Sequence, residues 1–556
     1  MHDVDPSDLD LRTEKISALP IINSYLEKLG IAGMLSERIE SSSRISTDSC
    51  LMVLVRNIIL EREPVYGIAE WSSQFDPSLF GLSPDLAKRI NDDRIGRSLD
   101  LLYDADRGSM LTELAVRSIR DFHIKMDEFH NDSTTITFSG NYDEADGSVR
   151  RGKESLKITH GHNKDHRQDL KQLLWTLTVS SDHSVPVHYM ALDGNTEDTE
   201  AHIDLWDSLR RIAGTADFIY VADSKLCTRE NMNHISDNKG KFITVLPASR
   251  SESTWFHEYV KNHRIEWKDA FTRKCHGKDI EFRVFDSPIP SSEGFGIIWA
   301  WSSQKEELDS DIRDKSIRTA ISKLDSLQAT LARRRMKRSR IIKKAEDAIS
   351  ETPYVTYQIR ETNSERFRKA GRGRPSPDTK YTRTVETRYQ VSWKLLTDAI
   401  EKDSISDGTF PLITNCRDLE ASDVLVKYKY QPMLEKRHEQ LKSQYNVMPV
   451  LFKSVERIEA FLFLYYIAML IQALIERDIR INMKSGNIAS IPVYSEDREC
   501  SSPTSYRILS KFENIVMNHI LVDGREVKTV HTELSKIQKQ ILSLLDIQEV
   551  KFWSNQ

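Results

Sequence analysis

This sequence has few cysteines, almost no excess of one charge over the other, and few long apolar runs. The five cysteines include no Cys-x-x-Cys pair, which argues against a zinc finger and against a secreted fold held by disulfides. The formal net charge is only −5 over 556 residues, so any basic surface for a nucleic acid must be local. Apolar residues make up 39% and charged residues 29%, which excludes collagen-like and wholly disordered chains.

Neither a signal peptide nor a membrane span is predicted. The chain begins Met-His-Asp-Val-Asp-Pro, which is acidic and polar. The most apolar stretch, Ala460 to Ile475, is shorter than the roughly 20 residues that a span needs, and Gln472 interrupts it. We therefore predict a buried core helix at this stretch, no membrane partner, and a location in a reducing cytoplasm.

A chain of this length is too long to fold around one hydrophobic core, and the spacing of its apolar residues changes along the sequence. Residues 1–125 are predicted to form an independent helical domain that binds DNA ends, because apolar residues recur there at spacings of three and four. Residues 126–250 predict three strands that can pair as a meander, then two strands that alternate with helices. This order resembles an α/β core of the ribonuclease-H-like type.

The second half of the chain predicts an interruption of that core. Residues 251–405 contain further strands and a long helix or helical pair, which together indicate an inserted domain. Residues 406–490 return to the core with a strand and with a helix whose first turn holds Pro432. Residues 491–556 are predicted to be a helical C-terminal region, with a short strand near Val527 to His531.

Two aspartates are predicted at the ends of core strands. Asp132 begins the strand at Ser133 to Phe138, and Asp223 follows the apolar run Phe218 to Ala222. In the predicted sheet these strands are neighbours, about 4.8 Å apart, and two carboxylates that close need a bound cation to stay ionised. An aspartate at a strand end is more often a turn or cap residue, but the joint placement favours an Mg²⁺ or Mn²⁺ site.

A third acid belongs to a series with helical spacing. The residues Tyr428, Gln431, Glu435 and Lys442 follow the pattern Tyr-x2-Gln-x3-Glu-x6-Lys, whose steps of 3, 4 and 7 keep one helical face. The shared face is secure for Glu435 and Lys442 and weaker for the two residues before Pro432. A solvated helix face is the alternative interpretation of such a quartet.

Together these residues resemble the DDE transposases of bacterial insertion sequences, in the group with the YREK signature, Tyr-x2-Arg-x3-Glu-x6-Lys. Tyr428, Glu435 and Lys442 match that signature. Gln431 replaces its arginine and removes a bidentate phosphate ligand, for which Arg437 or Lys436 would compensate. The resemblance covers most of the chain, including Asn91 to Arg94 before a helix and the stretch Gly161 to Arg167.

The resemblance implies a transposase that cuts and joins insertion-sequence ends by phosphoryl transfer at two Mg²⁺ (or Mn²⁺) ions. Asp132, Asp223 and Glu435 would be the catalytic and metal-binding acids, and Tyr428 and Lys442 would hold DNA phosphates. The partners would be double-stranded DNA, as terminal inverted repeats and as target, and a second copy of the chain in a homodimer. The protein would lie in the bacterial cytoplasm, on the nucleoid when bound to DNA.

Two other functions stay open from the sequence. One is a metal-dependent nuclease of the same fold that cuts DNA without joining it. The other is a non-catalytic DNA-binding protein derived from a transposase, against which the intact acid triad counts.

Three basic segments are further candidates for DNA contact. Arg333 to Lys344 holds eight Lys and Arg, beginning with Arg333, Arg334 and Arg335, and this concentration favours a phosphate-facing helix over a solvated one. The segment Gly371 to Pro375, with Arg372 and Arg374, is typical either of an AT-hook in a minor groove or of a flexible loop. Lys164 and Arg167 either line the catalytic cleft or solvate a turn.

Overall fold

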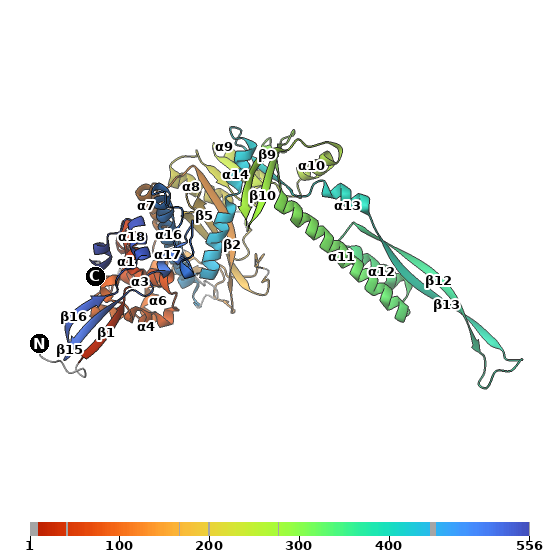
Figure 1. The fold of residues 1–556 in the computed structure, drawn as a ribbon, viewed down its shortest axis with the longest axis horizontal. Coiled ribbons are helices and arrows are strands. Elements are labelled where there is room, and N and C mark those ends of the chain that lie inside the picture. The colour runs from red at the N-terminus through yellow and green to blue at the C-terminus, as the bar shows by residue number, and fades with distance from the viewer. Residues whose placement is uncertain are drawn as a thin grey trace. The chain divides into compact units, whose positions relative to one another are not determined.

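The computed structural model describes residues 9–40, 43–165, 167–197, 199, 201–275, 277–444 and 452–554. They divide into two compact units (Figure 1). The first unit combines the chain up to Thr244 with the chain from Lys427 onwards, and the second unit is Val245–Val426. The second unit contains the predicted insertion at 251–405 and extends beyond it at both ends.

A sheet with the strand order β6-β5-β2-β7-β8 forms the centre of the first unit. The strands β2, β5 and β6 pair antiparallel, whereas β7 pairs parallel with β2 and β8 parallel with β7. Their bounds are β2 Glu128–Phe138, β5 Lys171–Ser180, β6 Pro186–Leu192, β7 Ile219–Val221 and β8 Lys241–Val245. Helix α8 (Ala201–Ala213) precedes β7, and α9 (Arg229–Asp237) precedes β8. The predicted meander followed by two alternating strands is therefore confirmed.

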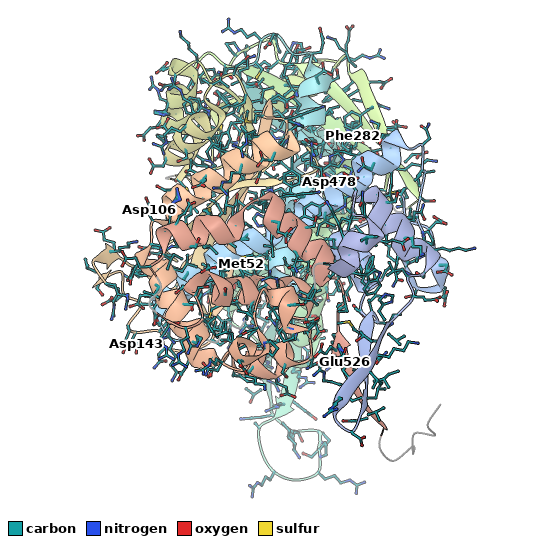
Figure 2. The ribbon with its side chains drawn as sticks, turned by 90° about the vertical axis from the view of Figure 1, so that its left-hand side faces the viewer. Met52, Asp106, Asp143, Phe282, Asp478 and Glu526 are labelled. Carbon is teal, nitrogen blue, oxygen red and sulfur yellow. The ribbon has the colours of Figure 1, made fainter. Side chains whose placement is uncertain are left out.

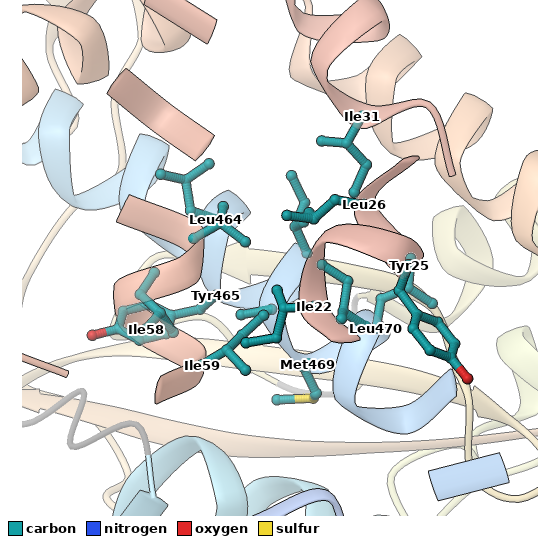
Figure 3. Packing of buried hydrophobic residues seen from close by; sticks show 14 of the residues in the cluster. Ile22, Tyr25, Leu26, Ile31, Ile58, Ile59, Leu464, Tyr465, Met469 and Leu470 are labelled. Atoms are coloured by element: carbon teal, nitrogen blue, oxygen red, sulfur yellow. The ribbon is translucent and has the colours of Figure 1, made fainter. Parts of the chain in front are cut away.

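One long helix, α16 (Val455–Ser485), organises the helical part of this unit. It packs against α1, α3 and α6, and Figure 3 shows residues such as Met469 among the side chains of these N-terminal helices. The helix is long and apolar enough to cross a membrane, but 89% of its most apolar window is buried by protein. A helix that is apolar all round is expected to be buried on all sides. The stretch Ala460 to Ile475 is thus a core helix in this structure, as predicted.

The N-terminal helices have no core of their own. Their buried side chains belong to one cluster with those of α16, so the predicted independent domain at 1–125 is instead part of the first unit. In Figure 2, Met52 is labelled on one of these helices, near the centre of the view. The bounds are α1 Leu19–Lys28, α2 Ile31–Arg38, α3 Thr47–Leu60, α4 Ile68–Ser73, α5 Pro84–Ala87, α6 Asp92–Asp104 and α7 Arg107–Phe122.

The two ends of the chain meet in a small sheet that the sequence did not predict. Strand β1 (Leu9–Lys15) pairs antiparallel with β15 (Val516–Val522), which pairs with β16 (Arg525–His531). Glu526 projects from this exposed hairpin (Figure 2). The predicted strand near residue 527 is confirmed. Within the region predicted to be helical, Val516–Val522 is instead strand β15, because pairing with β1 imposes strand geometry. The helices of this region are α17 (Ser505–Ser510), α18 (Lys536–Leu544) and α19 (Glu549–Ser554).

The second unit contains a four-stranded sheet and a helical pair. The sheet order is β14-β11-β10-β9, with bounds β9 Lys268–Cys275, β10 Lys278–Asp286, β11 Gly296–Ser302 and β14 Thr409–Thr414. Helix α10 (Ser251–Asn262) precedes this sheet in the chain. The predicted long helical segment is a pair, α11 (Ser303–Arg333) and α12 (Arg338–Ile349). Helices α13 (Thr397–Ser404) and α14 (Ala421–Tyr428) complete the return towards the first unit.

A long two-stranded ribbon extends from the helical pair. Strands β12 (Val355–Lys369) and β13 (Tyr381–Leu395) pair antiparallel over fifteen residues each. Near its base, Val355 and Val391 pack against buried residues of α11 and α12. Beyond the ends of these helices the ribbon continues with exposed side chains (Figure 1). Two of the strands predicted within residues 251–405 are therefore the arms of one long hairpin.

Candidate active site

Parallel pairing of β2 with β7 brings the two aspartates to matching positions. The parallel register ends with His130 opposite Val221. Asp132 on β2 and Asp223 just after β7 each lie two residues beyond that pair, and the axes of these neighbouring strands are about 4.8 Å apart. The sequence predicted that Asp132 begins its strand. In the structure β2 already begins at Glu128, so Asp132 lies within it. The predicted proximity of the two aspartates agrees with this register.

Helix α15 (Gln431–Glu439) carries the third acid. Its Pro432 lies in the first turn, as predicted, and the helix packs against β2. Leu434 and His438 are buried at a spacing of four, which fixes the inner face of the helix. Glu435 is exposed beside that face. The inner face thus combines one apolar residue, Leu434, with the buried polar residues Arg437 and His438.

Tyr428, the last residue of α14, lies within the electrostatic field of all three acids. Burial raises the pKa of its hydroxyl to about 12, and three negative charges add to that shift. They belong to Asp223, Asp132 and Glu435, in decreasing order of effect. All three predicted acids therefore act electrostatically on one tyrosine, although they are separated by up to 303 positions in the chain. Tyr428 itself precedes α15 and does not share a helix with Glu435.

Lys164 lies directly beside the first acid. Its ammonium donates to the Ser133 carbonyl oxygen at 2.7 Å and to the Ser133 hydroxyl at 2.6 Å, and it is 3.7 Å from Asp132 Oδ1. The buried Asn163 shapes the loop by accepting backbone N–H bonds from Asp165 and Arg167. Lys164 therefore lies beside Asp132, and the catalytic cleft considered for it from the sequence stays a prediction. His166 lies outside the described residues.

Lys442 lies on a π-helical turn rather than on a continued α-helix. Helix α15 ends at Glu439, and residues Gln440–Gln444 form the wider turn, so the spacing of seven from Glu435 no longer fixes a shared face. The Lys442 ammonium donates to both carboxylate oxygens of Asp165, at 2.7 and 2.6 Å. The partner of Lys442 in this structure is thus a carboxylate, whereas the sequence predicted a DNA phosphate.

Arg437 is an interior residue, contrary to the DNA contact predicted for it. It is 5% exposed, and its guanidinium donates to Glu476 on α16 at 2.9 Å and to the Ser184 carbonyl oxygen at 3.1 Å. Burial leaves no surface from which it could reach DNA, and its contacts anchor α15 to α16. Gln431, which replaces the signature arginine, donates to the Asn131 carbonyl oxygen at 3.3 Å and so contacts the residue before Asp132.

The remaining predicted DNA contacts lie outside this cluster. Arg167 forms an exposed bidentate pair with Asp169, at 2.9 and 2.8 Å. The others belong to the second unit. Arg333 ends α11, Arg334 caps it, and Arg335 pairs with Glu386 of β13. Arg372 and Arg374 are exposed in the turn between β12 and β13.

Sequence reasoning missed His438, whose Nε2 is 3.7 Å from Asp132 Oδ2. Burial, with the charges of Lys164 and Lys442, lowers the pKa of this histidine to about 3, so its ring is neutral. The signal was present as Glu435-x-x-His438, a spacing of three that puts both side chains near one helical face. The neighbouring His130 is also buried, and its ring bonds to Glu128 at 2.7 Å.

The donor chemistry of the three acids suits a hard divalent cation, since carboxylate oxygens are the ligands that Mg²⁺ and Mn²⁺ prefer. Their placement around Tyr428 is compatible with that role. Within the part of the chain that the structure describes, no three His, Cys, Asp or Glu side chains are grouped closely enough to hold a metal ion as they stand. Binding would therefore require the acid side chains to rotate towards one another, with Lys164 moving away from Asp132.

Comparison with known proteins gives one family match and several distant structures. A family model described as a domain of unknown function (DUF4277) matches residues 11–116. No curated protein matches the chain. A piggyBac transposase synaptic complex with hairpin DNA is similar at 10% identity and a TM-score of 0.34, over 97% of this chain and 80% of that one. A Mos1 transposase paired-end complex with the left transposon end is similar at 11% identity and a TM-score of 0.15, over 38% of this chain and 62% of that one.

Proposed function

We propose that this chain is a DDE-type DNA transposase with a ribonuclease-H-like catalytic domain, of the YREK group of insertion-sequence enzymes. One observation carries the proposal: Asp132 and Asp223 lie at matching positions on neighbouring parallel strands, and Glu435 acts on the same tyrosine as both. Three acids from separate segments are an unusual convergence for turn or cap residues. The signature residues Tyr428 and Lys442 border the same region.

In this proposal Asp132, Asp223 and Glu435 hold two Mg²⁺ (or Mn²⁺) ions, which supply activation of a hydroxyl nucleophile and stabilisation of the leaving oxygen. The residues of the chain position the DNA around that chemistry. The Tyr428 hydroxyl stays protonated at neutral pH and can donate a hydrogen bond to a phosphate oxygen. Lys164, 3.7 Å from Asp132, would place a positive charge beside a DNA backbone bound at these acids.

The test uses the full chain with duplexes that end in the inverted repeats flanking its coding region. We expect cleavage at the repeat ends in Mg²⁺ or Mn²⁺, and joining of the cut ends to a supercoiled plasmid. Chelation of the metal should stop both steps. Cutting without joining would favour the nuclease, and binding without cutting would favour the non-catalytic DNA-binding protein. Cross-linking with and without end DNA tests the proposed homodimer.

Lys442 offers a sharper test of phosphate binding, because its present partner is an acid. We expect Lys442→Ala to weaken binding of end DNA and to reduce the log–log salt slope by about 0.9, as for one lost phosphate contact. Asp165→Asn should strengthen binding, since it removes the carboxylate that competes with the phosphate. The measurement is fluorescence anisotropy of labelled end DNA between about 50 and 200 mM salt.

The double variant Lys442→Ala/Asp165→Asn provides the control. If Asp165 acts by occupying Lys442, the double variant should bind DNA as weakly as Lys442→Ala alone. An equal gain from Asp165→Asn in both backgrounds would mean that Asp165 merely repels DNA. Lys442→Arg should retain most of the affinity, because a phosphate accepts either cation.

A further inference from the structure

The β12–β13 ribbon separates its side chains by type between its two faces. The register is unbroken from Val355 opposite Leu395 to Lys369 opposite Tyr381, so alternate residues define two faces along the whole ribbon. All apolar and aromatic side chains of the two strands lie on the face that contains Val355, here called the apolar face. The opposite face, here called the basic face, carries none. Its members are Thr356, Gln358, Arg360, Thr362, Ser364, Arg366, Arg368, Thr382, Thr384, Glu386, Arg388, Gln390, Ser392 and Lys394.

The two faces also differ in charge. On the basic face five Lys and Arg stand against the single acid Glu386, which is itself paired with Arg335. On the apolar face Lys369 and Arg383 are balanced by Glu361 and Glu365, of which Glu365 pairs with Arg383. The positive charge of the ribbon is therefore concentrated on one side.

Stability of the fold does not account for the basic face. The base of the ribbon is held from the apolar side, where Val355 and Val391 join the core of α11 and α12. The side chains of the basic face are exposed, apart from Thr356 and Glu386 at intermediate burial. An amphipathic strand pair normally turns its polar face to water with mixed charges, because like charges close together repel. A face of one sign, with hydroxyl and amide groups between the cations, has the composition of a DNA-contacting surface.

We infer that the basic face of the β12–β13 ribbon lies in the major groove of double-stranded DNA. A two-stranded ribbon is one of the elements that the groove, about 12 Å wide, admits. Arg366, Arg368 and Arg388 can reach phosphates or guanine edges, and Gln358 and Gln390 present the amides that pair with adenine. This inference rests on the proposed function for its choice of DNA as the partner. It assigns the contact to a face of the ribbon and is independent of the minor-groove role considered for Arg372 and Arg374 at its turn.

The experiment compares two double variants that remove the same charge near the same end of the ribbon. Arg366→Gln/Arg368→Gln alters the basic face, and Lys369→Gln/Arg383→Gln alters the apolar face. Both are made in full-length Asp132→Asn protein, so that the DNA is not cut. Binding to a mixed-sequence duplex is measured by anisotropy over a range of salt concentrations. Circular dichroism and melting curves confirm that both variants fold like the parent.

The basic-face variant is expected to bind at least roughly tenfold more weakly at about 0.1 M salt, with a salt slope smaller by about 1.8. The apolar-face variant should bind within about threefold of the parent. Equal losses in the two variants would overturn the inference, because they would show diffuse attraction rather than contact by one face. Normal binding by the basic-face variant would overturn it too.

A second measurement identifies the groove. The second duplex carries glucosylated hydroxymethyl groups on its cytosines, and these groups fill the major groove. The parent should bind it more weakly, and the difference in affinity between the parent and the basic-face variant should largely disappear. A minor-groove ligand should leave that difference intact. If the modified duplex left the difference between parent and basic-face variant intact, the major-groove assignment would be overturned. If polyglutamate bound the parent as tightly as DNA does, and bound the basic-face variant more weakly, DNA would be overturned as the partner. Metal-dependent cutting by the wild-type chain is assayed separately, so failure of the ribbon inference and failure of the proposed function remain distinguishable.

Discussion

Replacing Asp132 or Asp223 by Asn, or Glu435 by Gln, is expected to lower the rate of DNA cleavage at least roughly a thousandfold. Each change keeps the size of the side chain but removes one negative charge from the site that would hold the metal ions. Affinity for end DNA should change little or rise slightly, because a repulsive charge has been lost. The measurement is single-turnover cleavage of end duplexes in Mg²⁺, beside anisotropy of the same duplexes.

Glu439→Gln is the matched control for Glu435→Gln. It makes the same chemical change on an exposed position of the same helix, four residues further on. This variant should cleave at the wild-type rate. Wild-type activity in any of the three amide variants would remove that acid from the triad, whereas lost activity in Glu439→Gln would show that α15 does not tolerate the change itself.

Arg437→Met is expected to lower the free energy of unfolding of the first unit by about 3 to 5 kcal/mol. The change leaves the buried carboxylate of Glu476 without the guanidinium that lies 2.9 Å away, although Glu476 still accepts a bond from the Ser505 amide. The nearby Arg480, at 3.5 Å, can compensate only in part. The measurement is the urea midpoint of this unit in variant and wild type.

The double variant Arg437→Met/Glu476→Leu distinguishes a buried ion pair from other causes of instability. Removing both charges should restore part of the lost stability, because the uncompensated carboxylate is gone while Arg480 keeps its hydrogen bonds to the Pro503 carbonyl oxygen. DNA affinity measured at low temperature, where the single variant is folded, should match that of wild type. A variant with normal stability and weakened DNA binding would instead support the contact that the sequence suggested for Arg437.

The features that the sequence predicted are those whose evidence is local. Asp132 and Asp223 could be paired in advance because each adjoins a short run of strand-forming residues, and the order of such runs limits how the sheet can be built. The helical start at Pro432 was predictable because proline suits the first turn.

Other features depend on partners distant in the chain. The role of Arg437 is set by Glu476, 39 residues later, and nothing near Arg437 marks it as buried. Strand β1 is stabilised by β15, about 500 residues away, and has too few apolar residues to indicate a strand alone. The turn that carries Lys442 has π rather than α geometry. Predicting a shared helical face from residue spacing assumes a regular α-helix, so it could not show this change.

The N-terminal helices share one hydrophobic core with α16, and this has a consequence for synthesis of the chain. After the first 244 residues have left the ribosome, residues 245 to 454 must follow before the helix that completes their core is made. At roughly 5–20 residues per second this interval lasts on the order of 10 to 40 s. The second unit has all of its residues by Val426 and can fold during that time, whereas the N-terminal helices wait with apolar faces uncovered. A chain released early would therefore carry a folded ribbon and no assembled acid triad, and its N-terminal part would be the segment that chaperones and proteases recognise first.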